Sequence, residues 1–273
     1  MSDPRAALTA IGALADAEIE IADAALHLAR VDAPEADWEA TRSHLSALAR
    51  EAAALGELVD GSDPAAQGAA LAALLAGRHG YRGDAETYDD LANANLIRVV
   101  ERRRGLPVAL GIVWLHAARA AGWDAQGVDF PAHFVIALSA NGQQAVLDPF
   151  AGGRRLERDG LLSLLRRIDA EATLPRGPLR PMPTRGVLLR LQNNILVRRL
   201  RAQDVAGALA CAEDMLRIAP DEAELWREAA TLYARLDQVN AALRCFERFA
   251  ALAPPEAAAR ARAAMAELRT RLN

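Results

Sequence analysis

The stretch GVDFPAHFVIALSANGQQAVLDPF, residues 127–150, contains two apolar runs separated by Asn141 and Gly142. An Asn-Gly pair readily adopts the two positive φ angles of a type I′ hairpin turn, and β-branched and aromatic residues favour strands. We therefore expect an antiparallel hairpin with strands at about 132–139 and 144–149. Because the first strand is apolar on both faces, helices should cover at least one side of the sheet.

This hairpin predicts that a histidine and an aspartate meet. Counting outward from the turn, Asp148 opposes Val135, which points to the same face of the sheet as His133. Asp148 should then lie diagonally beside His133, within reach of an imidazole and a carboxylate. An aspartate there could hold the tautomer of the imidazole and stabilise its charged form, as the acidic member of a catalytic triad does.

A triad also needs a nucleophile, and an apolar helix at 106–122 offers the expected place. The N-terminus of a helix lowers the pKa of a thiol and can hold an oxyanion. The sequence there reads GLPVALGIVW, and no Cys, Ser or Thr occurs from Tyr88 to Leu138. The two cysteines, Cys211 and Cys245, lie far along the chain, and we expect them to be reduced, buried thiols.

Composition excludes several partners. The chain has 273 residues and a net charge of -4, so it lacks the basic excess of proteins that follow a phosphate backbone. The basic run at 102–104 is a solvated helix end or, as the alternative, an anion site. The N-terminus lacks the apolar core of a signal peptide, and no run approaches the roughly 18 apolar residues of a membrane span. We expect a cytoplasmic protein with no nucleic acid or membrane partner.

The remaining polar residues carry no recognisable site. His27, His44, His79 and His116 have no partner at metal-binding spacing, and we expect them to be structural. No phosphate loop or metal motif is present, so we expect no cofactor and no metal.

The helical pattern indicates two domains. At least three helices fit within 4–78, further helices fit at 93–105 and 106–122, each closed by a glycine, and another fits near 157–168. The segment at 173–186 contains four prolines and is typical of a connector. We therefore divide the chain into a first domain at 1–180 and a second at 181–273.

The second domain contains an internal repeat. The stretches AGALACAEDMLRIAPD at 206–221 and NAALRCFERFAALAPP at 240–255 superpose at a shift of 34 residues, which pairs Cys211 with Cys245 and Pro220 with Pro254. A period of 34 with a proline after the second helix is typical of tetratricopeptide repeats. A last helix is expected at about 256–271. Such helices present a concave surface to a protein or peptide partner.

The chain resembles the bacterial SirB-type proteins. The resemblance rests on YRGDAETYDDLANANLIRVVERRRGLPVAL, GVDFPAHFVIAL, VLDPFAGGRRL and LLRLQNNILVRR, in that order. It implies a transglutaminase-like N-terminal domain before a short tetratricopeptide region, and it matches His133 and Asp148 to the histidine and aspartate of a Cys-His-Asp triad. Members of the family usually lack the cysteine and often have serines near its position, where this chain has Ala109 and Gly111.

We expect an α+β, mostly helical protein: a transglutaminase- or papain-like core with a small antiparallel sheet, then an all-α tetratricopeptide-like region. One hypothesis is a non-catalytic interaction protein, regulatory in its role, whose repeats bind a partner. The alternative is a hydrolase or acyl-transfer enzyme that uses His133 and Asp148. The enzyme requires an open pocket over His133 with a nucleophile or water in reach. The scaffold predicts a buried His133 that faces Ala109 and Gly111.

Overall fold

The computed structural model describes residues 3–128, 130–131, 133–166, 169–174 and 177–270. The chain forms two compact units: a core unit, Ala15–Leu191, and a repeat unit made of Met1–Leu14 together with Gln192–Asn273. The domains expected at 1–180 and 181–273 differ from these units at both ends, and they stay a prediction about independent folding. Residues 132, 167–168 and 271, where expected elements begin or end, lie outside the described residues.

The core unit combines helices with one main sheet. Its helices are α2 (Ile21–Asp32), α3 (Trp38–Leu58), α4 (Pro64–Ala72), α5 (Leu96–Arg102), α6 (Pro107–Ala120) and α7 (Arg158–Arg166), and its short helical turns are η1 (Asp16–Glu18), η2 (Ala73–Arg78) and η3 (Leu91–Asn93). Its strands are β1 (Arg82–Gly83), β2 (Arg104–Gly105), β3 (Asp124–Val128), β4 (Val135–Ala140), β5 (Gln143–Asp148), β6 (Arg154–Leu156) and β7 (Pro181–Met182). Strands β1 and β2 form a separate parallel pair.

Within the described residues, five strands form an antiparallel sheet in the order β6-β5-β4-β3-β7. The hairpin of β4 and β5 turns at Asn141 and Gly142, whose φ angles are 51° and 73°. Its register pairs Ile136 with Leu147, and both strands begin and end within three residues of the expected bounds. The α+β, mostly helical architecture with a small antiparallel sheet is confirmed.

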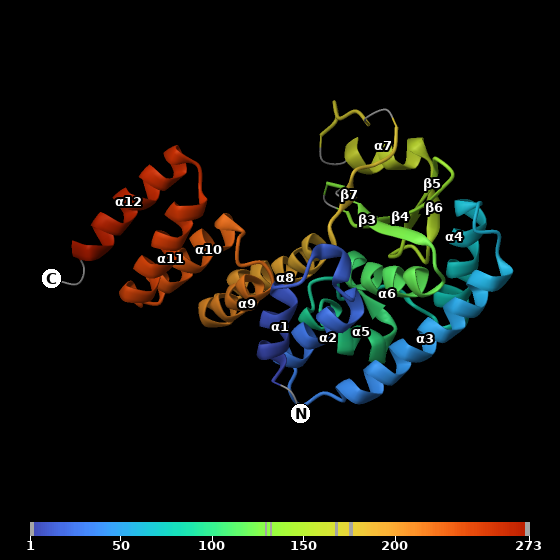
Figure 1. Ribbon diagram of the computed structural model, residues 1–273, viewed down its shortest axis with the longest axis horizontal. Helices are drawn as coiled ribbons and strands as arrows, with labels where there is room; N and C mark the ends of the chain where they lie inside the picture. The colour runs from blue at the N-terminus through green and yellow to red at the C-terminus, as the bar shows by residue number, and fades with distance from the viewer. Residues whose placement is uncertain (1–2, 129, 132, 167–168, 175–176, 271–273) are drawn as a thin grey trace. The chain divides into compact units, whose positions relative to one another are not determined.

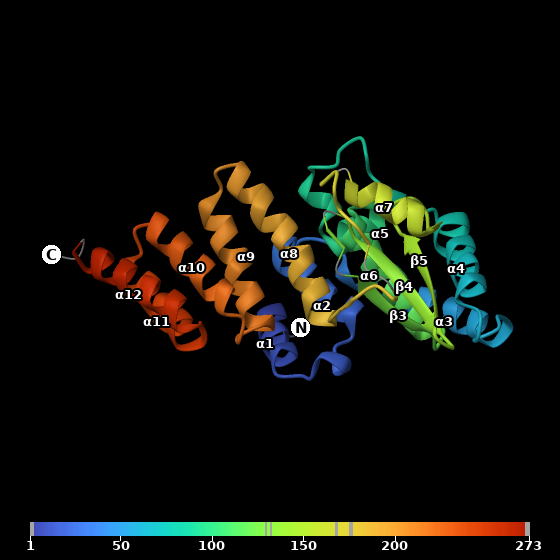
Figure 2. The ribbon, with the colours of Figure 1, turned by 90° about the horizontal axis from the view of Figure 1, so that it is seen from above.

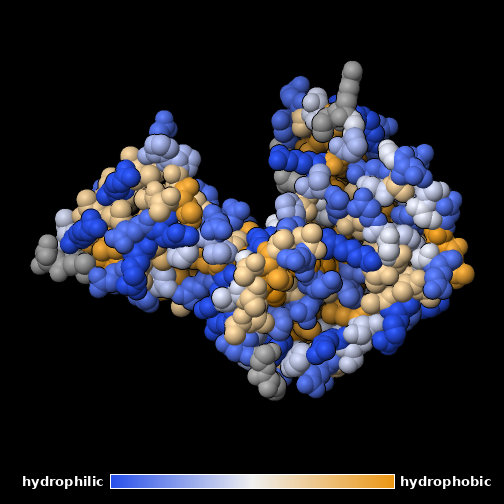
Figure 3. Space-filling model, in the orientation of Figure 1, coloured by the Kyte–Doolittle hydropathy of each residue, from blue (hydrophilic) through white to orange (hydrophobic). Residues whose placement is uncertain are grey.

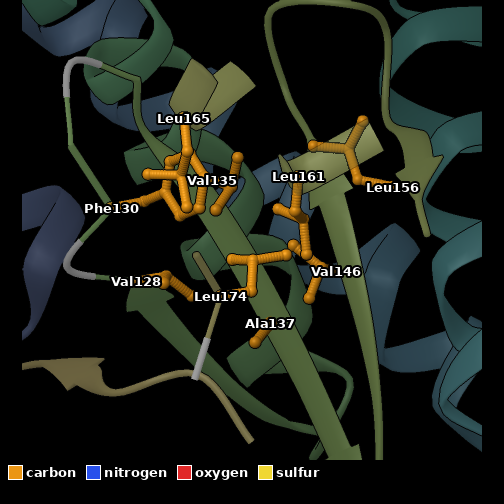
Figure 4. Packing of buried hydrophobic residues seen from close by; sticks show 9 residues of the cluster. All are labelled: Val128, Phe130, Val135, Ala137, Val146, Leu156, Leu161, Leu165 and Leu174. Atoms are coloured by element: carbon orange, nitrogen blue, oxygen red, sulfur yellow. The ribbon is translucent and has the colours of Figure 1, made fainter. Parts of the chain in front are cut away.

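Helices cover both faces of this sheet (Figures 1 and 2). On one face lies α6, a helix that is buried over most of its circumference, as its apolar sequence predicts. On the other face, side chains of β3, β4, β5 and β6 pack against Leu161 and Leu165 of α7 and against Leu174 (Figure 4). Alternate residues of β4 therefore serve two different apolar layers, which explains why its sequence is apolar throughout.

The sequence placed two helix ends at glycines, and the structure agrees with one of them. Helix α6 ends before Gly122, whose φ of 76° suits glycine, as expected. Helix α5 does not end at Gly105, because Arg103 adopts the left-handed conformation with φ of 57° and Gly105 pairs with Gly83 in the small parallel sheet. The chain thus leaves α5 three residues earlier than predicted, and this turn places Arg103 on a cluster of polar side chains described below.

The repeat unit is all helical. It contains α1 (Pro4–Gly12), α9 (Val205–Ile218), α10 (Ala223–Arg235), α11 (Val239–Leu252) and α12 (Pro255–Thr270), and the chain enters it within α8 (Thr184–Arg201). Figures 1 and 2 show α10, α11 and α12 packed side by side. Helices α9 and α11 have bounds that differ by the predicted 34 residues, and Ala208 and Ala242 are both fully buried. Among the described residues, no helix is long and apolar enough to cross a membrane.

The N-terminal helix α1 belongs to the repeat unit because it packs on α9. Arg5 donates two hydrogen bonds to Asp214, a buried carboxylate of α9, at 3.0 and 3.4 Å. A Cβ built on Gly12 would lie 2.1 Å from the carbonyl oxygen of Arg217, so only glycine permits this approach. The sequence-based division placed these first residues with the core, since no local pattern links segments about two hundred residues apart.

Replacing Gly12 with alanine should therefore destabilise the repeat unit. The added methyl group meets backbone, which cannot rotate away, and overpacking of this kind costs roughly 1–3 kcal/mol. Urea unfolding followed by circular dichroism measures the effect. Gly61→Ala is the matched control, because nothing lies within 4 Å of a Cβ at that position. Equal midpoints for the two variants would contradict the packing of α1 on α9.

Candidate functional site

The structure brings His133 and Asp148 together. Nε2 of His133 lies 3.0 Å from Oδ1 of Asp148, and the two side chains are 20% and 7% exposed. The same oxygen accepts hydrogen bonds from the backbone N–H groups of Phe150 and Ala151, at 3.0 and 3.2 Å. The imidazole is close enough for a hydrogen bond but is not aligned for one, so the contact is mainly electrostatic. The catalytic role of this pair stays a prediction.

The segment that carries His133 is held by its neighbour, Phe134. The ring of Phe134 lies between α6 and β3, where a Cβ on Gly111 would be 2.2 Å from it and a Cβ on Gly127 would be 2.9 Å from it. Phe134 is 1% exposed, so the ring fills this space completely. His133 lies just before β4 rather than within it, and its direction follows from the position of Phe134.

Arg190 of α8 fixes the same segment through the backbone. Its Nη2 donates to the carbonyl oxygens of Phe130 and His133, at 3.1 and 3.0 Å. Its guanidinium carbon also lies 5.7 Å from the centre of the Phe134 ring, a favourable cation–π distance. This arginine lies in the motif LLRLQNNILVRR, but the sequence predicts no role for it. Its acceptors are backbone carbonyl groups, which a pattern of side chains does not reveal.

The expected nucleophile position offers no reactive group. Ala109 and Gly111 are both buried in α6, and Gly111 faces Phe134 rather than His133, which corrects the arrangement expected for a scaffold. Among the described residues, no Cys, Ser or Thr side chain is hydrogen-bonded to His133. Within the same residues, no three His, Cys, Asp or Glu side chains are arranged to hold a metal ion.

A polar frame supports the first turn of α6. Asp84, which is 2% exposed, accepts hydrogen bonds from the backbone N–H and the hydroxyl of Thr87 and lies 2.8 Å from Nη2 of Arg102. Arg102 also donates to the side-chain oxygen of Asn93, and the backbone carbonyl of Asn93 accepts a hydrogen bond from the N–H of Leu106. The Thr87 hydrogen bonds, together with Arg102, hold the pKa of Asp84 at about 2. The frame closes the loop at 84–95 against the start of α6.

Phe150 connects this frame to the histidine. Its carbonyl accepts a hydrogen bond from the N–H of Gly83, and its ring packs so closely on Gly83 that a Cβ there would lie 2.5 Å away. The ring also makes edge contacts with His133 and with Tyr88, at centroid distances of 6.5 and 5.9 Å. His133 is therefore partly covered by aromatic carbon, and with 20% of its side chain exposed it is not fully buried, unlike the arrangement expected for a scaffold.

Comparison with known proteins agrees with this arrangement. A family model described as the transglutaminase-like superfamily matches residues 39–193. The chain belongs to the transglutaminase-like superfamily. A second model, described as a tetratricopeptide repeat, matches residues 195–273. The expected order, a transglutaminase-like core followed by an all-α tetratricopeptide region, is confirmed.

Proteins from bacteria and from a mammal are similar in sequence to this transglutaminase-like chain. A UPF0162 protein of Xylella fastidiosa strain Temecula1 is 32% identical over 190 residues, which cover 68% of each chain. A UPF0162 protein of Vibrio cholerae is 27% identical over 251 residues, which cover 88% of this chain and 89% of that protein. The F-box only protein 21 of Mus musculus is 30% identical over 70 residues, 26% of this chain and 11% of that protein.

The polar frame of the transglutaminase-like core should make stability depend on Asp84. Asp84→Asn removes a buried ionic hydrogen-bond acceptor, so we expect a loss of roughly 1–3 kcal/mol at pH 7. A carboxylate with a lowered pKa stabilises the fold above its unfolded pKa near 4, and this contribution is lost as the pH falls toward 2. The difference between wild type and variant should therefore shrink below about pH 4.

Urea unfolding at pH 7, 4 and 3 measures this dependence. Glu86→Gln serves as the control, because the Glu86 side chain is 84% exposed and lies 3.5 Å from Arg104. We expect that control to stay within about 0.5 kcal/mol of wild type. A difference for Asp84→Asn that does not change with pH would show that its carboxylate has an ordinary pKa.

Proposed function

We propose that this chain is a non-catalytic protein-interaction protein, in which the transglutaminase-like core is a scaffold and the repeats bind a partner. The observation that carries the proposal is the packing at the start of α6. Any side chain at position 111 would overlap the ring of Phe134, which a Cβ approaches to 2.2 Å. The core therefore uses for packing one of the two positions, 109 and 111, near which the family resemblance expects a nucleophile.

The thiols of the chain offer no replacement. Acyl transfer through a covalent intermediate needs a nucleophile within hydrogen-bond reach of its base. Cys211 and Cys245 are both buried in the repeat unit. The thiol of Cys211 lies within hydrogen-bond distance of the side-chain oxygen of Gln192, at 2.9 Å, and burial raises the pKa of the Cys245 thiol. Because both thiols are buried, neither has the access to substrate that a reactive cysteine requires.

A groove in the repeat unit supplies the proposed binding surface. It has a volume of about 460 Å³ and lies between α10, α11 and α12. Phe246, Phe249 and Ala261 contribute apolar lining, while Arg227 and Arg260 add positive charge. Arg227 is paired with Glu224 at 2.7 Å, whereas the exposed Arg260 has no ion-pair partner among the described residues. On the face shown in Figure 3, apolar side chains of the repeat helices lie among strongly polar ones.

This lining favours a peptide with an apolar side chain beside a carboxylate. Such a ligand buries carbon against the phenylalanines and pairs its charge with Arg260. The narrower membership in the bacterial SirB-type proteins, a regulatory role and a cytoplasmic location belong to the same proposal. The four sequence motifs support this membership, and the lack of a membrane-spanning helix among the described residues agrees with that location.

A hydrolase or acyl-transfer enzyme is the second candidate, and one observation favours it. Asp148 lies 3.0 Å from His133 and is itself fixed by two backbone N–H groups, which is the support that an acidic triad member gives to an imidazole. With Nε2 facing Asp148, Nδ1 would act as the base toward water. The histidine side chain is 20% exposed, so a small substrate could reach it.

A substrate panel separates the two candidates. We expect wild type and His133→Ala to show equal, background turnover of amide, ester and transamidation substrates, because no nucleophile is positioned. Phe150→Leu, which uncovers the histidine, should also stay at background. Turnover by the wild type that falls at least a hundredfold in His133→Ala would overturn the scaffold proposal and support the enzyme.

Partner capture tests the groove. We expect Arg260→Glu to reduce recovery of a partner from extract of the source cells about tenfold, which corresponds to about 1.4 kcal/mol. Arg262→Glu is the matched control, since Arg262 is also exposed on α12 but does not line the groove. These point variants keep α1, on which the repeat unit depends, whereas a truncation would remove part of that unit. Equal recovery with both variants would exclude the groove as the binding surface.

A further inference from the structure

A second polar cluster in the core unit shares no residue with the His133 and Asp148 pair. It brings together His44 of α3, His79 and Tyr81 after η2, and Arg103 after α5. Nη1 of Arg103 lies 2.6 Å from Nε2 of His44 and 2.6 Å from the hydroxyl of Tyr81, and that hydroxyl lies 3.0 Å from the same Nε2. The rings of His44 and His79 meet edge to face at a centroid distance of 5.6 Å.

Two rare backbone features place these side chains. The turn η2 is a π-helix, a rare form that is frequent at functional sites, and it leads directly into His79. Arg103 is a non-glycine residue with φ of 57°, a conformation that costs free energy unless other contacts maintain it. The carbonyl of Arg103 accepts from the N–H of Arg82, which fixes it in that conformation. The π-helical turn and the left-handed turn thus bring His79 and Arg103 to the same ring, that of His44.

The hydrogen bonds within the cluster leave a surplus of donors. Nη1 of Arg103 can only donate and lies 2.6 Å from Nε2 of His44, so we assign the single proton of the neutral imidazole to Nδ1. Nη2 of Arg103 lies 3.4 Å from that Nδ1. Two N–H donors therefore face each other without an acceptor between them. An oxygen atom placed beside both groups would accept from each.

The cluster also has a positive charge, on Arg103, that no described carboxylate balances. Among the described residues, the side chain of Arg103 forms hydrogen bonds with His44 and Tyr81 and no ion pair with a carboxylate. The nearby carboxylate of Glu51 is already paired with His79 and Arg78, at 3.0 and 3.1 Å. Burial, followed by the charges of Arg103 and His79, lowers the pKa of His44 to about 4. Burial raises the pKa of Tyr81 to about 12. Both groups are neutral at pH 7, so the guanidinium is not compensated.

We propose that this cluster is a binding site for a phosphate group, held by Nη2 of Arg103 and Nδ1 of His44. A phosphate oxygen supplies the missing acceptor, and its negative charge compensates the guanidinium. His44, His79 and Arg103 are only half-buried, so a ligand can approach from solvent. Donors that come from different elements suit the several oxygens of a phosphate better than the two coplanar oxygens of a carboxylate. The site is independent of the proposed partner-binding function.

Nuclear magnetic resonance of the histidine side chains in the full chain tests the site. Inorganic phosphate is titrated at pH 7 and at constant ionic strength set with sodium chloride. We expect the His44 signals to shift to saturation with a Kd in the millimolar range, and the pKa of His44 to rise when phosphate is bound, while His116 does not respond. Glycerol phosphate should bind similarly if a phosphate monoester is the natural ligand, whereas inorganic phosphate alone should bind if the site takes the free ion.

Arg103→Gln should weaken phosphate binding at least tenfold. Arg98→Gln is the matched control, because Arg98 lies on the neighbouring helix α5 and is paired with Glu35 and Glu101. His44→Gln, followed through the His79 signals, gives a second measure if Arg103→Gln does not fold. Unchanged His44 signals in phosphate would overturn the proposal. So would equal shifts with acetate or with sodium chloride alone, or equal affinity in Arg103→Gln.

Discussion

The ring of Phe134 lies between the backbones of Gly111 and Gly127, one in the buried helix α6 and the other in strand β3. A side chain at either glycine would come within 2.2 or 2.9 Å of the ring, so helix and sheet can keep this spacing only while both positions lack a Cβ. Interiors packed at such density transmit a shift of one group to its neighbours. The adjacent His133 therefore takes its position from a purely apolar contact.

This contact positions one member of the pair formed by His133 and Asp148, and the backbone positions the other. The imidazole and Asp148 face each other at 3.0 Å, and backbone donors satisfy the carboxylate. A buried carboxylate without such partners would cost several kcal/mol. The backbone thus satisfies the carboxylate by itself, whereas Nε2 of His133 has no aligned hydrogen-bond partner among the described residues.

Local sequence patterns predicted the parts of the fold that local physics controls. The Asn-Gly turn set the register of β4 and β5, which in turn brought Asp148 to His133, and the 34-residue period located α9 and α11. Strand β3 was missed, because the alternation in DAQGV is short and places only alanine and glycine on its buried side before Val128, its single β-branched residue. The contacts between Asp84 and Arg102, between Arg190 and two carbonyls, and between α1 and α9 join distant segments. No spacing rule for a single sequence identifies such pairs.

Both ends of the chain build the repeat unit, and this has a consequence for synthesis. Helix α1 is synthesised before the core unit, whereas α9, against which it packs, follows only after the whole core unit has been made. At 5–20 residues per second, α1 waits on the order of 10 to 40 s for its partner. Leu8 and Ile11, which are buried in the finished protein, stay exposed during that interval. Nascent chains of this protein should therefore be clients for chaperones that recognise short apolar segments near the N-terminus.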